Sequence, residues 1–291
     1  MTDPFVAHRS LLFTVAYEML GSAADAEDVV QDTWLRWAGL DASARAEVRD
    51  PRAFLVRIVT RQSLNRMRTV SRRREDYVGQ WLPEPLLTSP DVADDVELAE
   101  SVSFAMLTVL ETLAPTERAV FVLREVFEAP YDEIAEAVDK SPAAVRQIAH
   151  RARTRVAERR PRATVDRGQQ EAVVQQFMAA LSGGDLQALM DVLAPDVVAV
   201  GDGGGLAPAA KRPIVGADRV ARLLMAFSRQ QAAYTMSPTW LNGAPAARVD
   251  LDGAAAGVVS VVVEDGRITR LYAVANPHKL GRLGEEAALT R

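Results

Sequence analysis

The side chains best suited to chemistry in this sequence lie between residues 141 and 156. A helix would place five cationic or hydrogen-bonding groups on one side, namely Arg146, Gln147, His150, Arg151 and Arg153. Arginine pairs with guanine and glutamine with adenine in the major groove, and further arginines can hold phosphate. The pattern predicts a helix that reads duplex DNA. A merely solvated helix face is the alternative.

The residues around this helix have the spacing of a helix-turn-helix. A short helix is predicted over 131–138, followed by a turn at Asp139 and Lys140. Ser141 is a natural N-cap and Pro142 a natural first residue of the second helix. The apolar side of the second helix should pack on the first and consists of Val145, Ile148, Ala149, Ala152 and Val156. A cationic helix behind a short turn is typical of duplex recognition.

A second basic helix is predicted from Pro51 to residue 74. Residues 49–74 contain nine arginines and one acid, which fits a solvated face poorly. The polar side chains that could follow a nucleic-acid backbone and bond one base are Arg57, Arg61, Asn65, Arg66 and Arg68. This segment therefore predicts a second nucleic-acid contact.

An acidic helix is predicted over 22–38, with Asp25 as its N-cap and Asp28 three residues later. An acidic surface beside two basic ones should not face DNA. It is expected to face solvent or another protein. Trp34 and Trp37 within it are expected to lie in the core.

Residues 75–100 read as a linker, because they contain three prolines and the six acids of residues 84–100. Within them, Trp81, Leu82 and Leu86 are too apolar for a free tether. Pro83 and Pro85 would hold this stretch extended at low ordering cost. We expect the three apolar side chains to bury against the C-terminal part of the chain as a latch.

From residue 169 onward the pattern changes to helices followed by strands. The expected helices cover 169–182, 185–193 and 216–230, and the expected strands cover 233–241, 246–251, 254–264 and 267–275. The last two strands should form a hairpin across Asp265 and Gly266. Helices first and a curled antiparallel sheet afterwards predict an α+β domain.

The first 160 residues resemble a bacterial extracytoplasmic-function (ECF) sigma factor. The segment AEDVVQDTWLRW resembles region 2.2, which implies that Asp28, Gln31 and Asp32 contact the β′ clamp helices of the RNA polymerase core. PRAFLVRIVTRQSLNRMR resembles regions 2.3 and 2.4, which read the −10 promoter element as single strand. The segment around the helix-turn-helix resembles region 4, which reads the −35 duplex and lies on the polymerase β flap. Ile148 stands where many family members carry a basic residue. We expect it to pack against the protein and not to contact DNA.

Residues 169–275 resemble a SnoaL-like domain of the cone-shaped NTF2-like type, which one ECF subfamily carries fused at its C-terminus. The motifs of that subfamily are WLPEPL, DGGG and NPxKL. The last two correspond here to Asp202, Gly203, Gly204, Gly205, and to Asn276, Pro277, Lys279, Leu280. Leu206 stands where the subfamily has a lysine. The resemblance implies that this domain regulates the sigma factor in cis and that no separate anti-sigma protein is needed.

The expected organisation is two all-α sigma domains followed by the α+β domain. The expected units are region 2 (1–74), the linker (75–100), region 4 (101–160), a short linker (161–168), the SnoaL-like domain (169–280) and a tail (281–291). A 26-residue linker can span up to ~85 Å. Promoter elements ~17 base pairs apart are separated by about 58 Å. The linker can therefore bridge both elements.

Two other functions stay open at this point. One is a helix-turn-helix regulator that does not bind polymerase. The other is a DNA-tethered isomerase or cyclase, with Asp202, Tyr234, Asp250 and Tyr272 as candidate acids or bases. No sequence partner marks a catalytic dyad among them, so we expect no enzyme activity.

Composition limits which kinds of site and which classes of protein are expected. The chain has no cysteine and only three histidines, far apart, so we expect no metal, no cofactor and no disulfide. No apolar run approaches the ~18 residues of a membrane span, and the default location is cytoplasmic. A small ligand of the C-terminal domain stays open as a further partner.

Overall fold

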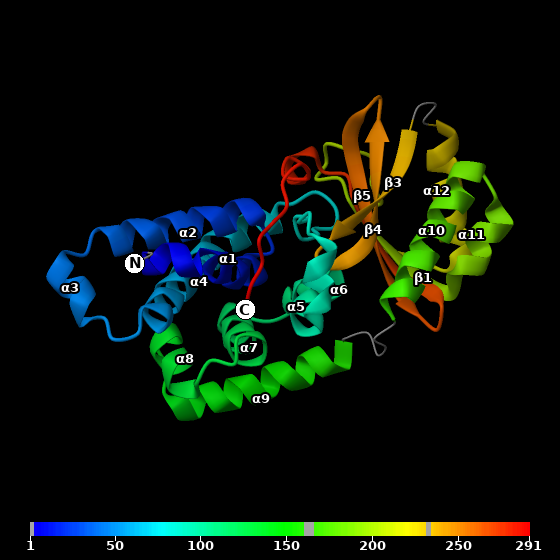
Figure 1. Cartoon of the computed structure of the whole chain (residues 1–291). Coiled ribbons are helices and arrows are strands. Elements are labelled where there is room, and N and C mark those ends of the chain that lie inside the picture. Colours follow the sequence, from blue (N-terminus) through cyan, green and yellow to red (C-terminus); the bar gives the residue numbers. More distant parts are fainter. Residues whose placement is uncertain (1–2, 160–165, 231–233) are drawn as a thin grey trace.

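The computed structural model describes residues 3–159, 166–230 and 234–291. Its first half is helical (Figure 1). The N-terminal helices are α1 (Pro4–Leu20), α2 (Ala23–Ala38), α3 (Ala42–Glu47) and α4 (Pro51–Glu75). A 3-10 turn (Pro90–Asp94) precedes α5 (Val96–Val102), α6 (Phe104–Leu110), α7 (Pro115–Phe121), α8 (Tyr131–Val138) and α9 (Pro142–Arg159). None of the helices in the described ranges has the length and apolarity needed to cross a membrane.

Helices α1, α2 and α4 pack together as one bundle. The start of α2 differs from our prediction. Its N-cap is Ser22, whose hydroxyl accepts a hydrogen bond from the Asp25 N–H at 3.2 Å, so the helix begins before Asp25. Trp37 is buried, but Trp34 is 37% exposed, and its ring centre lies 5.0 Å from that of Phe5. The expectation that both tryptophans lie in the core was wrong for Trp34.

The helix-turn-helix formed as expected. Helix α8 ends at Asp139, which adopts the left-handed conformation (φ 55°). The hydroxyl of Ser141 caps α9 by accepting a bond from the Ala144 N–H at 3.2 Å. The buried residues on the apolar side of α9 are Val145, Ala149, Ala152 and Val156, and Ile148 packs partly buried beside them. The prediction that Ile148 packs is confirmed.

Helices α5 and α6 are separate, because the chain breaks at Ser103. The Ser103 backbone is extended (φ −60°, ψ 150°), and its hydroxyl caps α6 by accepting a bond from the Met106 N–H. Serine competes for backbone hydrogen bonds in this way and favours helix starts. Helix α7 continues as a single π turn over Val122–Val126.

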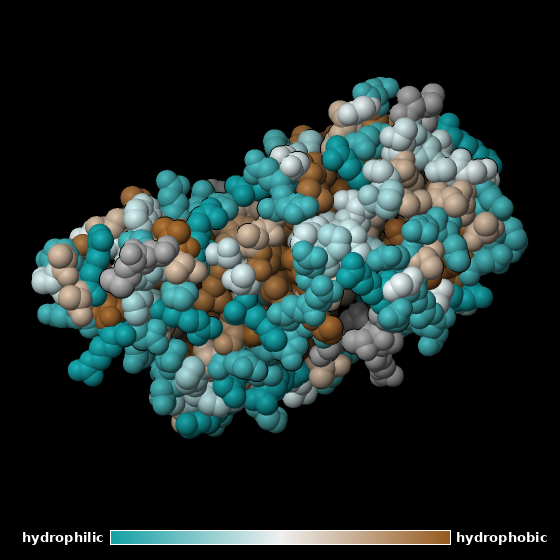
Figure 2. All heavy atoms as spheres, in the orientation of Figure 1, coloured by the Kyte–Doolittle hydropathy of each residue, from teal (hydrophilic) through white to brown (hydrophobic). Residues whose placement is uncertain are grey.

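The helical units do not have separate cores. One continuous cluster of buried side chains includes Leu55 and Val59 of α4, Leu107 of α6, Ile134 of α8 and Leu86 of the linker. The two regions that resemble sigma domains are therefore packed on each other in this structure. Figure 2 shows apolar side chains between the polar ones near the middle of the molecule, where the helical half meets the sheet.

The C-terminal part is a six-stranded sheet covered on one face by helices. The helices are α10 (Arg167–Gly183), α11 (Leu186–Val192) and α12 (Ala217–Gln230). The strands are β1 (Leu193–Asp202), β2 (Ile214–Val215), β3 (Tyr234–Leu241), β4 (Ala244–Leu251), β5 (Ala254–Glu264) and β6 (Arg267–Val274), in the order β2-β1-β6-β5-β4-β3. The hairpin across Asp265 and Gly266 formed, with both residues at positive φ.

Sequence reasoning missed β1 and β2, and the sheet is not wholly antiparallel. Strand β1 pairs in parallel with β6, with Asp202 opposite Val274. This pairing places the end of β1 beside the end of β6, and so brings the DGGG turn next to the NPHKL segment. The sheet face away from α10–α12 packs on the linker and α6, where Phe104 stacks on Tyr272 at 6.1 Å (Figure 1).

Candidate functional site

The linker lies buried between the helical half and the sheet. Leu82 and Leu86 are 1% and 3% exposed. The Glu84 N–H donates to the Gly21 carbonyl at 2.9 Å, and the Tyr17 hydroxyl donates to the Glu84 carbonyl at 2.8 Å. The extended WLPEPL backbone is thus hydrogen-bonded to the end of α1 on both sides of Glu84.

Asp202, at the end of β1, is the polar centre of this contact and is fully buried. Its carboxylate accepts hydrogen bonds from the Leu82 N–H at 2.8 Å, the Tyr77 hydroxyl at 2.5 Å and the Lys279 ammonium at 2.7 Å. Burial, and then the bond to Asp202, raise the pKa of Tyr77 well above its usual value. The hydroxyl therefore stays a donor to the carboxylate at neutral pH.

Lys279 joins the same linker segment from the NPHKL side. Its ammonium donates to the Leu82 carbonyl as well as to Asp202. It also lies 4.1 Å from the ring centre of Trp81 and 5.2 Å from that of Tyr77. A cation between two aromatic faces gains cation–π attraction. Leu206, which stands where the subfamily has a lysine, is 60% exposed, so the cation of this site is Lys279.

The DGGG turn fits its neighbours only as glycine. Gly204 has φ 59°, and a side chain on it would begin 2.3 Å from the amide nitrogen of Asn276. That amide group instead donates to the Tyr77 hydroxyl at 2.7 Å. Gly205 is also at positive φ and faces Val78 of the linker. The turn therefore leaves room for the linker and for Asn276 only because it carries no side chains.

Asn242, in the β3–β4 turn, is a second buried polar centre that sequence reasoning missed. Its side-chain oxygen accepts from the Leu86 N–H at 3.0 Å, and its amide donates to the Tyr17 hydroxyl at 2.6 Å and to the Val102 carbonyl at 2.8 Å. One side chain thus connects the sheet, the linker, α1 and α5. Its Asn242-Gly243 pair signals only a tight hairpin turn in the sequence.

Glu84 is the other residue that sequence reasoning did not single out. It is 6% exposed, and its carboxylate accepts from the Ser22 hydroxyl at 3.1 Å and the Ala24 N–H at 3.2 Å. These donors belong to the first turn of α2, where a negative charge is favourable. The acid of WLPEPL therefore holds the linker to α2.

The apolar latch residues divide between two surfaces. Leu82 joins the sheet core, as expected, but Leu86 belongs to the core of the helical half. Trp81 lies over Lys279 on one side, and a side chain on Gly21 would begin 2.7 Å from its ring. The expectation that all three bury on the C-terminal part was therefore too narrow, because the linker is covered from both sides.

The C-terminal tail crosses from the sheet to the helices (Figure 1, red). The Ala287 N–H donates to the Leu87 carbonyl at 2.8 Å, and Leu289 is buried in the helical core. Arg291 pairs with Asp95 at 3.0 Å, so part of the acidic run in the linker faces this tail. Another part faces α10, where Arg167 pairs with Asp94 at 3.2 Å.

Three of the five candidate −10 residues on α4 contact other helices. Arg57 pairs with the Glu136 carboxylate of α8 at 2.6 Å, and Arg61 donates to the Glu136 carbonyl at 2.6 Å. Arg66 pairs with Asp25 and, at 3.0 Å, with Asp28, and these acids raise the pKa of its guanidinium. Asn65 accepts a bond from Arg68 on the same helix. The basic side of α4 is thus in contact with α2 and α8.

The candidate −35 and polymerase residues lie on the surface. On α9 the exposed residues are Arg146, Gln147, His150, Arg151 and Arg153, and on α2 they are Asp28, Gln31 and Asp32. Arg146 lies over the Tyr131 ring, and Arg153 pairs with Glu125 at 3.2 Å. The structure therefore leaves the cationic side of α9 exposed, whereas on α4 Arg57, Arg61 and Arg66 are engaged with α8 and α2.

Comparison with known proteins gives the class of protein. Residues 5–73 match the sigma-70 region 2 model, and residues 103–156 match the sigma-70 region 4 model. The ECF RNA polymerase sigma factor SigJ of Mycobacterium tuberculosis is 38% identical over 94% of this chain and 91% of its own, and the probable ECF sigma factor SigI of that organism is 34% identical over 96% and 94%.

A solved structure agrees over the whole length. The crystal structure of SigJ from Mycobacterium tuberculosis superposes with a TM-score of 0.76 at 36% identity, covering 95% of this chain and 96% of that one. The helices and the site define a sigma factor with a fused SnoaL-like domain. This chain belongs to the ECF RNA polymerase sigma factors, which direct promoter-specific initiation of transcription.

An ionic network is buried where α1 meets α5 and α7. The Ser101 hydroxyl donates to the Glu18 carboxylate at 2.6 Å, and the Arg118 guanidinium donates to the Glu18 carbonyl at 2.8 Å and to Glu111. Burial raises the pKa of Glu18 to about 8, against the opposing effects of Ser101 and Arg118. Glu18 therefore holds a proton at neutral pH in this arrangement.

The Asp202–Lys279 pair should be a main contributor to folding stability. Replacing Lys279 by Met leaves a buried carboxylate without its cation, which costs roughly 3–5 kcal/mol. We expect urea unfolding to report a loss of that size for Lys279→Met. The exposed Lys211→Met should change the free energy of unfolding by less than about 0.5 kcal/mol. Equal effects of the two substitutions would contradict the assignment.

Glu18 should make stability depend on pH. Its pKa is about 8 when folded and near 4.5 when hydrated, so folding takes up a proton between these values. The free energy of unfolding should fall as pH rises from about 5 to 8, by at most ~1.4 kcal/mol per unit. The Glu18→Gln variant keeps the neighbouring Tyr17, Glu84 and Arg118 unchanged. Its free energy of unfolding should therefore depend less on pH. Parallel profiles would rule out Glu18 as the cause.

Proposed function

We propose that this sigma factor is restrained in cis by its SnoaL-like domain, which holds regions 2 and 4 together through the linker. The main support is that one linker segment is hydrogen-bonded to both halves of the molecule. Its partners are Asp202 and Asn242 on the sheet, and Tyr17 and Gly21 at the end of α1. A linker bound in this way is not free to extend. We call this arrangement the closed state.

Promoter geometry supports the proposal. Promoter elements ~17 base pairs apart are separated by about 58 Å. In the closed state Arg57 and Arg61 of α4 contact Glu136 of α8, which leads directly into the α9 reader. Helices α4 and α9 therefore cannot lie on both elements at once. Release of the linker from the sheet would let regions 2 and 4 separate.

The surfaces for polymerase and DNA follow from the family. We propose that Asp28, Gln31 and Asp32 contact the β′ clamp helices of the core enzyme and that region 4 contacts the β flap. The α4 residues would bind the −10 strand and the α9 residues the −35 duplex. The exposure of the α2 and α9 residues supports these assignments.

We propose that the SnoaL-like domain is a regulatory and not a catalytic unit. All four candidate acids or bases are engaged in structural contacts. Asp202 binds Lys279, and Asp250 binds Arg248 through both oxygens. Tyr234 donates to the Leu181 carbonyl, and Tyr272 stacks on Phe104. With each of the four candidates engaged in such a contact, they do not form a pair of groups that could transfer a proton to and from a substrate.

Polymerase dependence can be tested by reconstituted transcription on genomic DNA with mapping of RNA 5′ ends. The protein with core polymerase should start transcription at defined sites that core alone does not use. Asp28→Lys should reduce these starts by about tenfold or more, because it reverses charge at the proposed interface. Asp196→Lys, an exposed acid on β1, is the matched control. Unchanged starts with Asp28→Lys would favour a regulator that needs no polymerase contact.

The closed state can be tested through Glu136. A protein that must open before binding has an apparent affinity reduced by its open fraction. Removing an exposed ion pair costs up to about 1 kcal/mol, so Glu136→Gln should tighten binding to core polymerase roughly two- to fivefold. Glu133→Gln, on the same helix without a contact to α4, should leave the affinity unchanged. If both variants bind core polymerase with the affinity of the unaltered protein, the contact between α8 and α4 does not restrain the closed state.

A further inference from the structure

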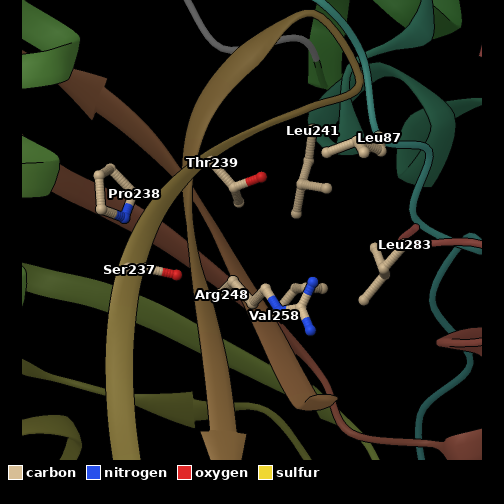
Figure 3. A pocket seen from close by; sticks show the side chains of 8 residues that line it. All are labelled: Leu87, Ser237, Pro238, Thr239, Leu241, Arg248, Val258 and Leu283. Carbon is tan, nitrogen blue, oxygen red and sulfur yellow. The ribbon is translucent and has the colours of Figure 1, made fainter. Parts of the chain in front are cut away.

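A cavity of about 250 Å³ lies between the sheet and the segments that cross it (Figure 3). Its floor is a row of paired residues on β3, β4 and β5, namely Ser237, Arg248 and Val258. Its walls come from outside the sheet, with Leu87 of the linker on one side and Leu283 of the tail on the other. It lies on the sheet face opposite to α10–α12, against the latch.

The polar groups of this cavity converge on one space. Arg248 is fixed because its Nε donates to both oxygens of Asp250, at 2.9 and 3.1 Å. Its two terminal nitrogens have no hydrogen-bond partner among the residues that the structure describes, and neither do the hydroxyls of Ser237 and Thr239. Figure 3 shows the guanidinium and both hydroxyls directed toward the gap below Leu241.

We propose that this cavity is a binding site for a small carboxylate with an apolar body, such as a short fatty acid or an aromatic acid. A guanidinium held in place matches a carboxylate with two parallel hydrogen bonds. Leu87, Val258 and Leu283 would contact the apolar part. Ligand sites usually measure ~300–1,000 Å³, so the volume restricts the ligand to a small acid.

Such a ligand would be coupled to the latch. Leu87 forms backbone bridges with Leu241 of β3 and with Glu286 of the tail, so this wall exists only while the linker lies on the sheet. A ligand that contacts both Leu87 and Arg248 binds the closed state more tightly than the open one and therefore stabilises it. This coupling rests on the proposed restraint in cis, whereas the binding site does not.

Binding is tested by calorimetric titration of the full chain with benzoate and hexanoate, each against its neutral amide. The carboxylates should bind with a Kd between about 10 μM and 10 mM, the range open to ligands of this size, and the amides at least tenfold more weakly. Arg248→Gln should remove the preference, while the exposed Arg219→Gln should keep it. Leu87→Ala, which leaves the Arg248–Asp250 pair intact, should weaken binding severalfold.

The outcomes separate the site from its coupling. Absence of carboxylate binding up to about 10 mM, or equal binding by Arg248→Gln, overturns the site. If benzoate binds, saturating benzoate should lower the affinity for core polymerase severalfold, and Arg248→Gln should abolish this effect. Binding of benzoate with unchanged polymerase affinity overturns the coupling. The Glu136 variants test the closed state without any ligand.

Discussion

The buried pair of Asp202 and Lys279 is the interaction on which the closed arrangement depends. Both charges are out of water, so each requires the other, and the hydrogen bonds around them satisfy the remaining capacity of the carboxylate. Two of the groups bound here belong to the linker backbone at Leu82. The ion pair therefore does more than stabilise the SnoaL-like domain, because it fixes a segment that regions 2 and 4 need in order to separate.

The contact is suited to reversal. The hydrogen bonds that hold the linker can be exchanged for bonds to water on opening, whereas the buried Leu82 and Leu86 oppose opening in proportion to their area. Tethering raises the effective concentration of the domain to the mM range, so even modest contacts are mostly formed. Under the proposed restraint the linker serves two states, bound and extended, and its prolines limit the ordering cost of the first.

Much of the fold could be predicted from local pattern, but several elements could not. Local patterns located α2, α4, α8 and α9 because each buries one side, whereas α1 is buried all round from Leu11 to Leu20. Strand β1 was missed because it lies between a helix and a turn and pairs with β6, more than sixty residues later. The break at Ser103 depends on a cap that a continuous apolar pattern conceals. The shared core was not predicted, since periodicity shows that a side is buried but does not identify its partner.

For the site, the sequence by itself determined which residue types matter: a cationic side on α9, a basic side on α4, an apolar linker segment and two motifs in the C-terminal part of the chain. These are local properties of composition and spacing. Only the tertiary structure decided that Lys279 is the cation beside Asp202, that Glu84 binds α2 and that Asn242 connects three segments. Buried polar groups must find partners, and those partners are set by proximity in space between residues up to 225 positions apart.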